Sequence, residues 1–145
     1  VNNTANALIR FDGSCKDLIR RKQDSLLAQI DILDQEFTAT ISLLANRKFL
    51  IFHPALTYLA RDYDLEQISM ELEGKEPSVA HFKEIVDRTK AENIKVIFIQ
   101  KEFETRNAEQ MAQETGARII QIDPLEENWM KHMKELLIIL KDLDN

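Results

Sequence analysis

Apolar residues recur at helical spacing in the first third of the chain. Over residues 14–46 they step by three or four positions, apart from one wider gap at residues 20–25. This period is that of one helical face. Its members are Ile19, Leu26, Ile30, Leu33, Phe37, Ile41 and Leu44. Residues 3–11 show a shorter helical pattern, which Asp12-Gly13 closes. We therefore predict a short helix, then a long one over residues 14–46.

Short apolar runs alternate with helical patterns in the rest of the chain. The runs cover residues 48–52, 65–69, 95–100 and 118–122, and each reads as a buried strand. The helical stretches begin at Pro54, Ser78, Thr105 and Glu127. Ser78 suits a helix N-cap, and Gly116 suits a left-handed C-terminal cap.

Strands joined by helical crossovers pair in parallel and carry helices on both faces of the sheet. We therefore predict an α/β fold with a four-stranded parallel sheet in the order 2-1-3-4, helices on both faces, and a long connecting helix before it. The predicted boundaries are residues 1–46 for the two N-terminal helices and residues 47–145 for the α/β unit.

The long helix is large for the unit that follows it. A helix over residues 14–46 would measure about 50 Å, whereas a unit of about 100 residues has a radius of gyration of roughly 13 Å. The far end of the helix is therefore expected to pack on something outside this chain. The alternative is a self-contained helical hairpin, in which the first helix folds back on the second.

Composition excludes several classes of protein. Hydrophobic residues make up 44% and charged residues 30%, ordinary values for a globular domain. The net charge of −6 argues against a nucleic-acid partner, because phosphate recruits Lys and Arg. Cys15 is the single cysteine, so a disulfide framework and a cysteine zinc site cannot be built. No glycine-rich phosphate loop and no Gly-x-Ser-x-Gly elbow is present.

Candidate ligands stand just past the ends of the predicted strands, where open parallel sheets bind their ligands. His53 follows the first strand directly and Asp123 follows the fourth. Gln100 closes the third strand, with Glu102 two residues on. An imidazole and a carboxylate on one sheet edge suit Zn²⁺. The alternatives stay open: His53 as a loop residue, and Asp123 as a turn former or N-cap.

Other polar groups are expected to be structural or solvated. His81 and His132 fall on predicted helices and are expected at the surface. The acidic cluster Glu71, Glu73 and Glu76 is expected to be a solvated loop.

Residues 52–63, with the sequence FHPALTYLARDY, resemble the signature F-H-x-A-(F/L)-x-Y-(F/L)-A-x-x-Y of the zinc- and manganese-binding receptors of ABC importers. The loop GKEPS at 74–78, the strand VIFI at 96–99, the helix end A-x-E-T-G at 112–116 and the segment IDPL at 122–125 also match, in order. The family's long connecting helix precedes the His motif, as the helix over residues 14–46 does here.

The resemblance implies half of a two-lobed receptor, in which two α/β lobes hold an ion in the cleft between them. Carried over, His53 and Asp123 are the ligands of the C-terminal lobe, and the paired histidines of the missing N-terminal lobe have no counterpart. His53 in place of Glu favours Zn²⁺ over Mn²⁺. The implied protein is periplasmic or cell-surface, and it delivers its ion to an ABC permease in the membrane rather than catalysing a reaction.

Three departures from the family pattern stand out. Asp64 replaces a usual Gly, at a position that Asp tolerates in a left-handed conformation. Gln100-Lys101 replaces a common acidic residue and Pro, and the loop after Asp123 is short. The rival interpretation is a stand-alone α/β interaction or regulatory module without a metal.

Overall fold

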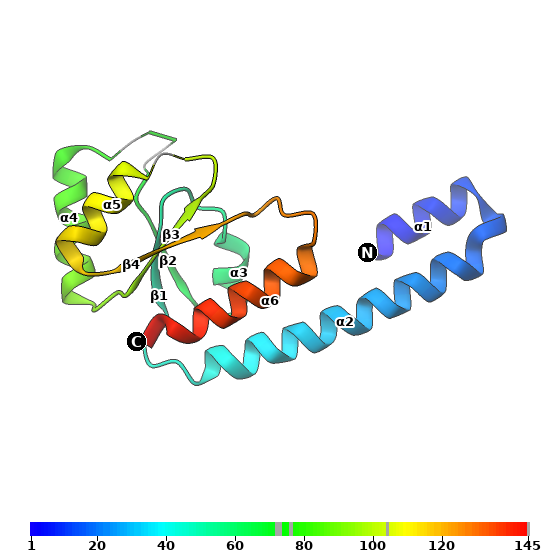
Figure 1. Cartoon of the computed structure of the whole chain (residues 1–145). Coiled ribbons are helices and arrows are strands. Elements are labelled where there is room, and N and C mark those ends of the chain that lie inside the picture. Colours follow the sequence, from blue (N-terminus) through cyan, green and yellow to red (C-terminus); the bar gives the residue numbers. More distant parts are fainter. Residues whose placement is uncertain (72–73, 76, 104, 145) are drawn as a thin grey trace. The chain divides into compact units, whose positions relative to one another are not determined.

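The computed structural model describes residues 1–71, 74–75, 77–103 and 105–144, and the chain divides into two compact units, residues 1–39 and 40–145 (Figure 1). The helices are α1 (Asn2–Phe11), η1 (Gly13–Cys15, a 3-10 turn), α2 (Lys16–Ser42), α3 (Thr57–Asp62), α4 (Val79–Ala91), α5 (Arg106–Thr115), α6 (Trp129–Leu140) and η2 (Lys141–Asp144, also 3-10). The strands are β1 (Lys48–Ile51), β2 (Glu66–Ser69), β3 (Val96–Gln100) and β4 (Arg118–Ile122). In the described part of the chain, no helix is both long and apolar enough to cross a lipid bilayer.

The first unit is a helical hairpin. Gln23 Nε2 donates to Asn2 Oδ1 at 2.6 Å, and Arg20 donates to Asn6 Oδ1 at 3.1 Å. From the first pair to the second, the partner on α1 moves forward along the chain and the partner on α2 moves back, so the two helices are antiparallel. The first helix therefore folds back on the second, as the hairpin alternative expected. That the far end of the long helix also packs on something outside this chain stays a prediction. The long helix is also shorter than predicted, because residues 13–15 form a 3-10 turn that the Asp12 side chain caps.

The apolar face of α2 changes in exposure along its length. Leu33, Phe37 and Ile41, in the C-terminal half of this helix, are buried. Leu26 is 38% exposed and belongs to the predicted apolar strip, whereas Ile19 is half-buried. Other large apolar side chains on the hairpin are exposed, namely Leu8, Phe11, Leu18 and Ile32.

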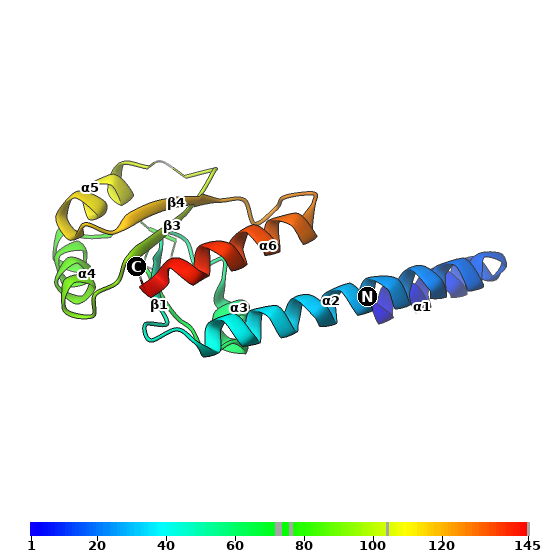
Figure 2. The same ribbon diagram turned by 60° about the horizontal axis from the view of Figure 1, so that its bottom comes forward.

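The second unit is a four-stranded parallel sheet in the order β2-β1-β3-β4, which confirms the predicted class and strand order. Helices α4 and α5 lie on one face of the sheet, and α3 and α6 lie on the other (Figures 1 and 2). From β1 the chain passes through α3 to β2 on one side of β1, and then through α4 to β3 on the other side. The direction of winding therefore reverses between β1 and β3.

Both faces of the sheet are buried because alternate residues of each strand enter different halves of the core. Leu50, Ile97 and Ile99 belong to a cluster that includes Ile85 of α4 and Met111 of α5. The residues between them face the other way, where the rings of Phe49 and Phe98 meet edge to face at 5.2 Å. All five residues of β3 are buried, as its unbroken apolar run predicts.

Local sequence signals explain most element boundaries. Gly116 takes φ 77° at the C-cap of α5, and Asp64 takes φ 56°, the left-handed conformation expected of it. The predicted helix start at Pro54 is wrong, since α3 begins at Thr57. A turn occupies the residues between, in which Ala55 N donates to His53 O at 2.7 Å. The Gln67 side chain then accepts from Leu56 N at 3.0 Å.

Candidate metal-binding edge

His53 and Asp123 lie at the same edge of the sheet. His53 comes two residues after the end of β1, and Asp123 directly follows β4. Both strands run parallel to β3, which lies between them, so their carboxyl ends meet at one edge. The shared edge confirms the predicted placement. That the two side chains enter one crevice and bind one ion stays a prediction.

Three contacts hold His53. Its Nδ1 atom lies 2.7 Å from Glu71 Oε2, and its ring stacks on Phe103 with centroids 5.5 Å apart. Its backbone carbonyl accepts from Gln100 Nε2 at 2.7 Å. The side chain is nevertheless 48% exposed, so the imidazole is both fixed in place and accessible to a ligand.

The expectation of a solvated acidic loop is wrong for Glu71, whose side chain is only 9% exposed. Its backbone N–H donates to Phe52 O at 3.1 Å, and its carbonyl accepts from Ser69 Oγ at 2.9 Å. The first contact joins the end of β2 to the end of β1, and the second lies within the end of β2. Glu71 follows β2 by two residues, as His53 follows β1, so the rule that selected His53 also selects Glu71. Glu73 and Glu76 lie outside the described residues.

Asp123 forms an ion pair with the side chain of Lys101. Its Oδ2 atom accepts from Lys101 Nζ at 2.8 Å, and Oδ1 accepts from Leu125 N at 3.1 Å. The hydrogen bond from Lys101 lowers the pKa of the Asp123 carboxyl, and the same bond raises the pKa of Lys101. Asp123 therefore forms the turn that the alternative interpretation expected, and it keeps its negative charge.

A small cavity of about 120 Å³ lies beside Asp123. Lys101, Glu126 and His132 are among its lining residues, and His53 is not. His132 is half-buried there rather than at the surface as expected, and its charge contributes to the lowered pKa of Asp123. His81 is also half-buried, with Nδ1 at 3.6 Å from Glu84.

The side chain of Gln100 is the least satisfied polar group at this edge. The residue is 3% exposed, and its Oε1 atom is buried without a hydrogen-bond partner among the described residues. Across the same described residues, no cluster of three or more His, Cys, Asp or Glu side chains is placed to hold a metal ion.

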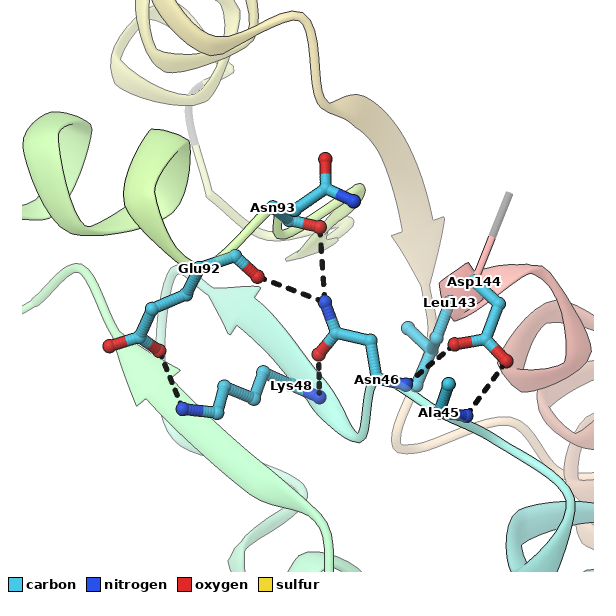
Figure 3. Close-up of a pocket in the computed structure, with 7 residues that line it drawn as sticks. All are labelled: Ala45, Asn46, Lys48, Glu92, Asn93, Leu143 and Asp144. Carbon is cyan, nitrogen blue, oxygen red and sulfur yellow. Dashed lines mark hydrogen bonds and ion pairs between the residues drawn. The ribbon is translucent and has the colours of Figure 1, made fainter.

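The opposite, amino edge of the sheet carries a larger hollow, of about 560 Å³ (Figure 3). Its polar side chains are paired with the chain itself. Asp144 accepts from Ala45 N at 3.0 Å and from Asn46 N at 2.6 Å. The Asn46 amide donates to the carbonyls of Glu92 and Asn93, and Glu92 accepts from Lys48 Nζ at 2.7 Å. These groups are used in joining α4, β1 and η2, so the hollow is structural.

Two known proteins are similar in sequence to most of this chain. The zinc-binding protein AdcA of Streptococcus pyogenes is 32% identical over 136 residues, which cover 92% of this chain and 26% of that protein. The high-affinity zinc uptake system protein ZnuA of Bacillus subtilis is 26% identical over 128 residues, 87% of this chain and 40% of that protein.

A crystal structure of ZnuA superimposes with a TM-score of 0.94 at 33% identity. The match covers 99% of this chain and 55% of that one, so the chain spans about half of the solved protein. The sequence model of the zinc-uptake complex component A, periplasmic, matches residues 1–142. The chain therefore belongs to the family of the periplasmic zinc-uptake component ZnuA.

Proposed function

We propose that this chain is half of an extracytoplasmic receptor, which captures Zn²⁺ and delivers it to an ABC permease in the membrane. His53 and Asp123 supply this chain's share of the ligands. The observation that carries the proposal is their common position, at the carboxyl ends of β1 and β4, in a chain of the zinc-uptake family. Ligands of open parallel sheets bind at this edge, beside the point where the winding reverses.

The donor types favour zinc over manganese. An imidazole is a good ligand for Zn²⁺, and Mn²⁺ prefers sites built from carboxylates and water. Zinc sites are normally four-coordinate. Two ligands from this chain therefore leave two positions, which a second lobe outside this chain fills in the complete receptor.

Two observations support a second lobe. The chain spans only 55% of the solved ZnuA structure that it matches over nearly all its own length. The α1–α2 hairpin also exposes Phe11, Leu18 and Ile32, and exposed apolar side chains are the kind of surface that another lobe covers. The α2 helix is proposed to be the connection between the lobes. In this mechanism the permease moves the lobes apart, which removes half of the ligands and frees the ion.

Zinc titration calorimetry tests the proposal on this chain and on the full-length receptor. We expect weak binding by this chain, because water must fill half of the coordination shell, and tight binding by the receptor. His53→Ala and Asp123→Asn should each weaken both. The matched controls are His81→Ala and Asp87→Asn, which change the same residue types on α4, outside the proposed pair of ligands.

Tight one-to-one binding by this chain that survives His53→Ala would overturn the proposed site. Equal zinc affinities for the His53 and His81 variants of the full receptor would do the same. Either result would favour a stand-alone α/β interaction module, in which His53 and Asp123 are structural.

A further inference from the structure

We propose that Glu71 is a positioning residue for the metal ion, acting through His53. Its carboxylate accepts a hydrogen bond from the Nδ1–H group of His53, which leaves Nε2 as the atom that binds zinc. This inference rests on the proposed function, because it assumes that His53 is a ligand. It adds Glu71 to the site and identifies Nε2 as the imidazole atom that binds zinc. It also explains why the ring is oriented before an ion binds.

The hydrogen-bonding chemistry fixes the tautomer. A neutral imidazole has one N–H donor and one acceptor nitrogen, and an ionised carboxylate only accepts. At 2.7 Å from Glu71 Oε2, Nδ1 must therefore carry the proton. The lone pair then resides on Nε2. Metal-binding histidines commonly donate their other N–H to a carboxylate in this way, which sets the ring orientation and raises the basicity of the ligand.

The packing around the pair holds both partners in place. Glu71 is nearly buried, and its backbone is tied to Phe52 and Ser69. Gly74, at φ 76°, lies beside the Glu71 carboxylate, since a Cβ there would be 3.5 Å from Glu71 Oε1. On the other side, Phe103 stacks on the imidazole and Gln100 holds its backbone carbonyl. The ligand is therefore oriented before an ion arrives, which lowers the entropy cost of binding.

Nitrogen-15 NMR of the metal-free chain reports the tautomer directly. We expect Nδ1–H for His53 in the unmodified chain and a shift toward Nε2–H in Glu71→Ala. The expected loss of zinc affinity in Glu71→Ala is about 10–100-fold, the usual effect of removing such a partner. Glu71→Gln keeps a carbonyl acceptor and should lose less. The control is Glu114→Ala, which removes an exposed carboxylate of α5 without changing the tautomer.

Three results would overturn the role of Glu71. One is an unchanged tautomer in both Glu71 variants, and another is a zinc affinity of Glu71→Ala equal to that of Glu114→Ala. The third is loss of the Nδ1 proton on zinc loading, which would mean that zinc binds Nδ1. Should Glu71→Ala fail to fold, Glu71→Gln and the zinc-loading measurement still decide the matter. If His53→Ala leaves zinc binding unchanged, the proposed function fails instead, and the metal-free tautomer tests the pair independently.

Discussion

The ammonium nitrogen of Lys101 lies 2.8 Å from Oδ2 of Asp123. The two residues end neighbouring strands, β3 and β4, at the carboxyl edge of the sheet. Lys101 is also one of the positions at which this sequence departs from the pattern of the family that it resembles. A zinc ion that binds Asp123 must compete with a cation already bonded to the same carboxylate.

We predict that Lys101→Met increases the zinc affinity of this chain. The side chain keeps its length but loses the competing charge. The gain should be several-fold and no more than about tenfold, because a partly exposed ion pair is weak. Competition with a chromophoric chelator measures it, and Lys90→Met, an exposed lysine of α4, is the control. Reduced affinity would show that Lys101 organises Asp123 for the ion instead of competing with it.

An ion-pair network connects the amino half of the sheet to α4. Lys48 Nζ lies 2.7 Å from Glu92 and 3.1 Å from Glu66, and Arg88 bonds both carboxylates. Hydrogen bonds from Lys48, and then from Arg88, lower the pKa of Glu66 and of Glu92. Both groups therefore bind a proton less readily in the folded chain than in the unfolded one.

From these shifts we predict a loss of stability in acid. A carboxyl group with a lowered pKa stabilises the fold fully above its unfolded pKa of about 4.3, and this stabilisation disappears as the pH falls through the lower folded pKa. Urea midpoints measured between pH 6 and pH 2 should fall less steeply for Glu66→Gln and Glu92→Gln than for the unmodified chain. Glu114→Gln, an exposed residue of α5, should leave the slope unchanged. Identical slopes in all four chains would contradict the prediction.

We predict that Gly116→Ala destabilises the α/β unit by roughly 1–2 kcal/mol, the usual cost of a left-handed conformation for a residue with a Cβ. The cost is conformational, because a Cβ at Gly116 meets no atom within 4 Å. Gly13 has equally open surroundings without a positive φ, so Gly13→Ala is the matched control and should be nearly neutral. Urea denaturation measures both. Equal effects would mean that φ at residue 116 is not what requires glycine.

The sheet could be predicted because each strand carries its own signal. The run from Val96 to Ile99 is too short for a helix and too apolar for a loop, and Ser78 and Gly116 mark helix ends by their own chemistry. The start of α3 could not be found in this way. It depends on Gln67, a residue of β2 that holds Leu56 N across the structure. A contact of that kind leaves no local pattern around Pro54.

The candidate site was predictable only in part, for a related reason. Asp123 follows β4 directly and His53 comes two residues after β1, so strand boundaries locate them. Glu71 follows β2 equally closely, but its acidic neighbours suggested a solvated loop. Its backbone bonds to Phe52, just past the end of β1, and a contact of that kind leaves no local pattern in the sequence. Lys101 was visible as a departure from the family pattern, whereas its bond to Asp123 depends on the register of β3 with β4.

The Asp144 carboxylate accepts hydrogen bonds from the backbone N–H groups of Ala45 and Asn46 (Figure 3). The segment that leads into β1 and the last 3-10 turn of the α/β unit therefore lie side by side. That proximity makes the unit suitable for circular permutation, which succeeds where the ends of a fold lie close together. A short peptide could join residue 144 to residue 45, and the backbone could be opened in the exposed stretch of residues 124–128. The strand order would be kept, and the new ends would lie beside Asp123. Probes could then be attached at the carboxyl edge without altering a side chain there.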